Sequence, residues 1–142
     1  MKDVIILDTG STINATFMNP NMVTGIKMSK NLIGMRKKAG SKTITLKGSL
    51  DRLRETWYDP EQMGNIFGFS HMVDRHRITY DSEQEDAILI HNTEEGTGKF
   101  KRTPEGIYTY KPTANYLQKV AEKQHVQPLK ETDDVNIAEK IL

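Results

Sequence analysis

A carboxylate and two hydroxyl side chains lie within four consecutive residues near the start of the chain, Asp8-Thr9-Gly10-Ser11. The apolar run Val4–Leu7 precedes them and predicts a buried strand that ends at Asp8. The glycine lets the backbone turn sharply and leaves room beside the carboxylate. Thr9 and Ser11 flank that turn and can donate hydrogen bonds. A carboxylate held in a partly desolvated loop has a tunable pKa, which suits general acid–base catalysis.

One such carboxylate can activate water when a second carboxylate faces it and the pair shares a proton. One member then acts as the base and the other as the acid. The chain contains no second Asp-Thr-Gly and no Asp-Ser-Gly. Two equivalent loops therefore require a two-fold homodimer with one Asp8 from each subunit on the axis. The same tripeptide also occurs as an ordinary surface turn, and in that case it carries no chemistry.

The composition excludes several classes of protein and of functional site. The chain has 142 residues, a net charge of +1 and 36% hydrophobic residues, which predicts one domain with a small core and gives no support to a strongly basic nucleic-acid binder. The absence of cysteine excludes disulfides, zinc–thiolate sites and thiol catalysis. The longest apolar run, Val4–Leu7, is too short for a transmembrane span or a secretory leader. Because Met1 directly precedes a predicted strand, we expect the chain to be cut from a longer polypeptide.

The elements that must position Asp8 are predicted to be short strands. Their spacing of about 8–12 residues is typical of an all-β sandwich or barrel. The expected strands cover residues 2–7, 31–37, 43–48, 54–58, 77–80, 87–91, 99–101 and 106–110. A brief helix is expected over residues 70–76, with Ser70 as its N-cap. Beyond Pro112, apolar residues recur at helical spacing, so residues 113–142 are predicted to form a C-terminal extension, partly helical and partly disordered.

Three blocks resemble the motifs of a known family. Leu7-Asp8-Thr9-Gly10-Ser11 is similar to a catalytic loop, Asn65-Ile66-Phe67-Gly68 to a second signature, and the interval around Ala39-Gly40-Ser41 to a flap hairpin. With these blocks the sequence resembles the retropepsins, the dimeric aspartic proteases of retroviruses and LTR retrotransposons. From Thr9 to Tyr110 it is similar to the protease segment of copia-type retrotransposon polyproteins, notably those of diatoms and related marine algae.

The resemblance implies an all-β fold, a retropepsin-like closed β-barrel with a flap hairpin and one short helix, over residues 1–112. Residues 113–142 would lead toward the integrase segment of the polyprotein. The implied activity is that of an aspartic endopeptidase, a homodimer that cleaves its parent polyprotein with water activated between two Asp8 carboxylates. We expect an intracellular, cytoplasmic location within retrotransposon particles, and no cofactor, metal, nucleic-acid or membrane requirement.

The resemblance also assigns roles within the catalytic loop. Asp8 would be the catalytic carboxylate, and Thr9 would bridge the two subunits by hydrogen bonds below the pair. Gly10 would contact the substrate backbone. Ser11 would donate a hydrogen bond to the outer oxygen of Asp8.

Further roles fall outside the loop. Ile66 would line a substrate pocket, and Gly68 would let its segment pack close to the catalytic loop. Ala39, Gly40 and Ser41 would contact the substrate, with Gly40 at the flap tip. Since lysines surround this tip, at positions 37, 38 and 42, we expect a more open flap than the glycine- and isoleucine-rich flaps of the viral enzymes.

Two other interpretations stay open. The chain could be a retropepsin-like dimerisation or peptide-binding module with little or no catalysis, or a protease kept dormant because its monomer predominates. The four histidines are scattered and no cysteine accompanies them, so we expect no metal site. Trp57 and Tyr58 are expected to pack in the core or the sheet rather than to bind a ligand.

Overall fold

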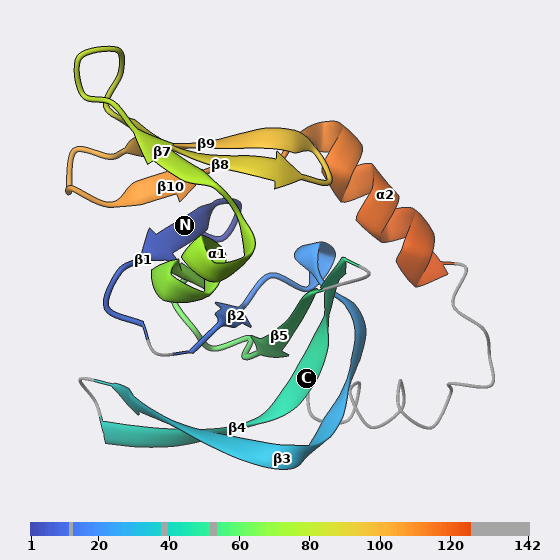
Figure 1. The fold of residues 1–142 in the computed structure, drawn as a ribbon. Helices are drawn as coiled ribbons and strands as arrows, with labels where there is room; N and C mark the ends of the chain where they lie inside the picture. Colours follow the sequence, from blue (N-terminus) through green and yellow to red (C-terminus); the bar gives the residue numbers. More distant parts are fainter. Residues whose placement is uncertain (12, 38–39, 52–53, 126–142) are drawn as a thin grey trace.

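The computed structural model describes the chain except for residues 12, 38–39, 52–53 and 126–142. Within the described residues, ten strands form one mixed sheet in the order β3-β4-β5-β2-β6-β1-β10-β9-β8-β7, accompanied by two α-helices (Figure 1). The elements are β1 (Ile5–Asp8), β2 (Ala15–Phe17), the short 3₁₀ helix η1 (Pro20–Met22), β3 (Thr24–Lys37), β4 (Gly40–Asp51), β5 (Arg54–Tyr58), β6 (Asn65–Gly68), α1 (Phe69–Arg75), β7 (Ile78–Tyr80), β8 (Ala87–Thr93), β9 (Gly96–Arg102), β10 (Tyr108–Tyr110) and α2 (Ala114–His125).

The predicted closed, all-β barrel is wrong, because the sheet is open and the fold is mixed α/β. In the described part, the edge strands β3 and β7 each pair with one neighbour, β4 and β8 respectively. Closure would require β3 to pair with β7. Because β3 has 14 residues and β7 only 3, few backbone groups of β3 would find a hydrogen-bond partner on β7. The helix α2 also packs against β3 and η1, beside the edge that closure would need.

The middle of the sheet is where β1 lies, parallel to β6 on one side and antiparallel to β10 on the other. Its side chains alternate between the two faces of the sheet, as in any strand. Ile5 and Leu7 are buried on one face, while Ile6 and Asp8, on the other, are half-buried. The apolar run of the sequence thus delivers a carboxylate to the end of a central strand.

The core lies on the face of the sheet toward which Ile5 and Leu7 point. Its ring contacts include Phe17 against Phe67, with centroids 5.4 Å apart. The buried members of this cluster are Ile5, Leu7, Ala15, Phe17, Met22, Val23, Leu46, Leu50, Tyr58, Phe67, Met72, Ile90 and Phe100. Residues from nine elements meet here, so one core holds both halves of the sheet together.

The two helices differ from their sequence-based predictions in detail. α1 begins at Phe69 with Gly68 as its N-cap, so Ser70, the predicted N-cap, lies inside the first turn. In α2, Val120 is buried, and the side-chain amide of Gln124 donates to the carbonyl of Val23 at 2.6 Å. α2 is therefore packed onto the sheet. The proposed division at residue 112 stays a prediction, and residues 126–142 lie outside the described part.

Neither of the helices described here combines the length and the apolar character needed to cross a bilayer.

Candidate active site

Asp8 ends β1 and opens onto a surface loop. Its side chain is half-buried, whereas the following residues Thr9 and Gly10 are exposed. The backbone N–H of Gly10 donates a hydrogen bond of 2.9 Å to Oδ1 of Asp8. This bond fixes one carboxylate oxygen against the loop, so the loop presents an oriented carboxylate at the surface of the single chain.

Gly68 holds the end of β6 against the same loop. It is the register partner of Asp8 in the parallel pairing of β1 with β6, and its N–H donates to the carbonyl of Asn14 at 2.9 Å. A Cβ at this position would lie 2.4 Å from the carbonyl oxygen of Ile13. Only glycine therefore allows this approach to Ile13, and the packing of Gly68 against the catalytic loop that the resemblance implies stays a prediction.

Ser11 makes its hydrogen bonds within the loop. Its hydroxyl donates to the carbonyl of Ile13 at 3.0 Å and accepts from the N–H of Ile13 at 3.2 Å. In the single chain, the hydroxyl that was expected on the outer oxygen of Asp8 is thus engaged with the backbone of Ile13. These bonds brace the return of the chain toward β2.

The strand register places a row of side chains on the same face of the sheet as Asp8. Ile6 faces Ile66, Ile66 faces Thr16, and Thr16 faces Trp57 across successive strand pairs. Residues directly opposite one another point to the same face, and Asp8 shares the face of Ile6 two residues before it. We call these five residues the Asp8 face.

Two half-buried aliphatic side chains, Ile6 and Ile66, lie nearest to Asp8 on this face. Ile66 was expected to line a substrate pocket, and the register places it beside the carboxylate's strand. Ile6 was not singled out from the sequence. The signal was present in the strand period, since Ile6 precedes Asp8 by two residues just as Ile66 precedes Gly68.

Trp57 and Tyr58 divide between the two faces. Tyr58 is buried in the core, as expected, but Trp57 lies half-buried on the Asp8 face. The ammonium of Lys47 lies 4.9 Å from the centre of the Trp57 ring, and its Nζ is 3.1 Å from Oε2 of Glu55. The Asp8 face therefore ends, at β5, in an aromatic ring flanked by an ion pair.

The expected flap corresponds to the β3–β4 hairpin. Gly40 begins β4 opposite Lys37, and Ser41 lies opposite Arg36, while Ala39 lies outside the described residues. These ends of β3 and β4 lie on the same side of the view as the loop that follows β1 (Figure 1).

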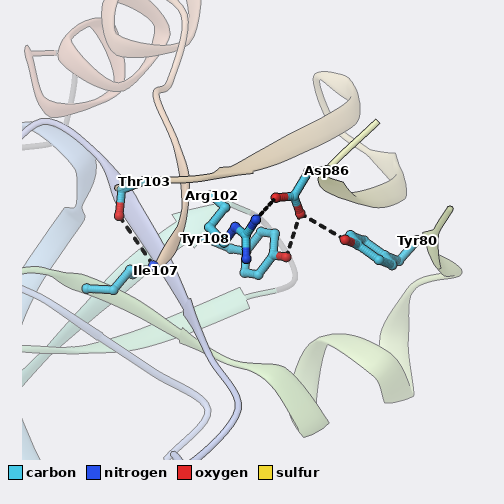
Figure 2. Close-up of polar contacts among 6 residues, drawn as sticks. All are labelled: Tyr80, Asp86, Arg102, Thr103, Ile107 and Tyr108. Atoms are coloured by element: carbon cyan, nitrogen blue, oxygen red, sulfur yellow. Dashed lines mark hydrogen bonds and ion pairs between the residues drawn. The ribbon is translucent and has the colours of Figure 1, made fainter. Parts of the chain in front are cut away.

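A second polar cluster surrounds Asp86, the residue just before β8 (Figure 2). Its Oδ1 accepts hydrogen bonds from the hydroxyls of Tyr108 at 2.7 Å and Tyr80 at 2.8 Å, and its Oδ2 lies 2.6 Å from a guanidinium nitrogen of Arg102. These donors, first Tyr108 and then Tyr80, hold the pKa of Asp86 below its ordinary value. The cluster joins β7, β9 and β10 and involves none of the Asp8 face, so we interpret it as a structural clasp.

His76 and His91 form hydrogen bonds with neighbouring groups. Nδ1 of His76 lies 3.0 Å from the carbonyl oxygen of His91, and Nε2 of His91 lies 2.8 Å from the hydroxyl of Thr79. Among the residues that the structure describes, no group of three or more histidines and carboxylates is placed to hold a metal ion.

Comparison of the chain with known protein families, with curated proteins and with solved structures gives no match.

Proposed function

We propose that this protein is an aspartic endopeptidase of the retropepsin type that acts as a homodimer. The observation that carries the proposal is the placement of Asp8, which ends a central strand on an exposed loop and has one oxygen held by the N–H of Gly10. The neighbouring aliphatic side chains of Ile6 and Ile66 on the same face offer apolar surface to a substrate beside that carboxylate.

The chemistry needs two carboxylates of different protonation state. The ionised one takes a proton from water, whose oxygen forms a bond to the scissile carbonyl carbon. The protonated one gives its proton to the carbonyl oxygen, which produces a tetrahedral intermediate. Collapse of this intermediate breaks the C–N bond. The nitrogen leaves with the proton held by the pair, and one hydroxyl of the intermediate gives a proton back to the pair as the carboxyl group forms. No covalent bond to the protein forms.

One chain supplies one of these carboxylates. Thr9 and Gly10 are exposed beside Asp8, so a second copy can approach the loop and place its own Asp8 opposite. Thr9 would then bridge the two subunits, and Ser11 and Gly68 would hold each loop in shape. Two coupled carboxylates titrate as a pair, so the activity should follow a bell-shaped, acid-leaning pH profile.

The substrate would be a polypeptide bound in extended form. Main-chain hydrogen bonds would provide affinity, and side-chain pockets near Ile66 and the flap residues 39–41 would set preference. By resemblance, the biological substrate is the parent copia-type polyprotein inside cytoplasmic particles. The proposed reaction uses no cofactor, metal, nucleic acid or membrane.

The test is the cleavage of a denatured generic protein between pH 4 and 8 by the wild type and by Asp8→Asn, each at several concentrations. The proposal predicts cleavage that rises in specific activity with concentration in the wild type and is lost in the variant. Equal cleavage by both proteins would overturn it. If neither protein cleaves at any pH or concentration, the peptide-binding module becomes the better interpretation.

A further inference from the structure

Trp57 is the only tryptophan in the chain, and it lies on the face of the sheet that carries Asp8 rather than in the core. By contrast, the next residue, Tyr58, is only 2% exposed and packs among the core residues. A large apolar ring left half-buried on the sheet face that also carries Asp8 offers contact area to an extended ligand.

We propose that Trp57 is a specificity-determining residue, which binds an apolar side chain of the substrate polypeptide about four residues from the scissile bond. This inference rests on the proposed endopeptidase function, because it assigns a subsite to the same face.

The position follows from the strand order. β5, which carries Trp57, is separated from β1 by β2 and β6. Three spacings of about 4.8 Å place the two strands about 14 Å apart. Because an extended peptide advances about 3.4 Å per residue, it covers this distance in about four residues. Ile66 and Thr16 lie in the same row between the two strands. Ile66 is half-buried and Thr16 is 2% exposed, so a peptide on this face would touch Ile66 and Trp57 and pass over Thr16.

The chemistry of the subsite follows from the charges around the ring. The ammonium of Lys47 lies over the ring, and Glu55 is 3.1 Å from that ammonium. The two opposite charges compensate each other, so they offer no net charge to an ionic partner. The ring itself offers apolar area, and a charged substrate side chain would lose hydration there and would have to compete with the existing pair of Lys47 and Glu55. An aliphatic or aromatic substrate side chain is therefore the one that fits.

Because Trp57 is the sole tryptophan, its fluorescence reports on this subsite directly. The probes are decapeptides of alanine and serine with a central Phe-Leu pair, carrying either leucine or aspartate at the second and ninth positions. They are titrated into the full-length Asp8→Asn protein, which cannot complete the catalytic pair. The leucine peptide should blue-shift the emission and bind about tenfold more tightly than the aspartate peptide. Equal binding without a change in emission would overturn the inference.

A kinetic experiment uses the otherwise wild-type protein. Trp57→Ala should reduce the ratio of kcat/KM for the leucine peptide over the aspartate peptide about tenfold, mainly through KM, and Trp57→Phe should restore most of it. Val73→Ala is the matched control, because Val73 is a 47% exposed apolar residue on α1. An unchanged ratio in Trp57→Ala would overturn the subsite while leaving the endopeptidase intact. A fluorescence difference without any cleavage by the wild type would overturn the endopeptidase and support the binding surface.

Discussion

Asp8 and Gly68 face each other across the parallel pairing of β1 with β6, at the point where both strands end. Residues far apart in the sequence meet here in the centre of the sheet. From Asp8 the chain enters the exposed loop, and from Gly68 it enters α1. This pair therefore connects the candidate catalytic loop to the rigid part of the fold.

The close approach at Gly68 predicts a sharp effect of one added methyl group. In Gly68→Ala the new Cβ would lie 2.4 Å from the carbonyl oxygen of Ile13, a backbone atom that can move only with the loop. We expect a loss of about 1–3 kcal/mol in the free energy of unfolding, measured by denaturant titration, together with loss of cleavage.

Gly98→Ala is the matched control for this substitution. Its Cβ would meet Cε1 of Phe100 at 3.8 Å, which is ordinary van der Waals contact, so its stability should stay close to that of the wild type. If both alanine variants are equally stable, Gly68 does not hold the loop as described.

Asn65 predicts a second stability effect, at the other end of β6. Its side chain is fully buried, and its Oδ1 accepts from the N–H groups of Met18 at 3.0 Å and Asn19 at 2.9 Å. Its Nδ2 donates to the carbonyls of Lys2 at 2.8 Å and Val4 at 2.9 Å. Asn65→Ala removes all four of these hydrogen bonds, although the carbonyl of Lys2 keeps a second donor, the side-chain amide of Asn19 at 3.0 Å. We expect a loss of about 2–4 kcal/mol in the free energy of unfolding.

Asn21→Ala provides a comparison for Asn65, since Asn21 is an exposed residue of η1. Thermal unfolding of both variants measures the difference between them. A change in Tm no larger for Asn65→Ala than for Asn21→Ala would contradict the stabilising role of the four hydrogen bonds of Asn65.

The sequence predicted the immediate setting of Asp8 well, because that setting is local. The apolar run before Asp8 produced the strand that ends there, and the bounds expected for β5, residues 54–58, are the observed ones. The hairpin strands were less predictable. β3 and β4 extend over 24–37 and 40–51, through lysines, serines and glycines that show no long apolar alternation.

The sheet topology could not be obtained from strand spacing. Strand spacing predicts how many strands there are but not which of them pair. Here β1 pairs with β10, the first strand in the sequence with the last. The face on which Trp57 lies could not be predicted for a related reason. Trp57 and Tyr58 are both large aromatic residues on alternate faces, so the strand period alone does not tell which ring faces the core.

The Asp86 clasp predicts a pH dependence of stability. Hydrogen bonds from Tyr108 and Tyr80 lower the pKa of Asp86 from its ordinary value of 3.8 in the folded protein. Below about pH 4 the unfolded chain therefore binds the proton more readily than the folded one, so this stabilisation is present at neutral pH and is lost as the pH falls. Asp86→Asn should lower Tm at pH 7, and the difference from the wild type should shrink toward pH 3.

The control for the clasp is Glu105→Gln, an exposed carboxylate in the turn before β10. Melting curves from pH 3 to pH 7 should superimpose on those of the wild type for this variant. If the Tm of Asp86→Asn lies below that of the wild type by the same amount over that whole pH range, the charge of Asp86 does not cause the stabilisation.

In the proposed enzyme each active site needs Asp8 from two copies of the chain. Subunit mixing tests it most directly: a fixed amount of wild type receives increasing amounts of Asp8→Asn, and the cleavage of a denatured protein is measured after equilibration. Because mixed dimers hold only one catalytic carboxylate, we expect activity to fall progressively as the variant is added. Activity that stays constant in a large excess of the variant would show that a single chain carries a complete site, and would contradict the account.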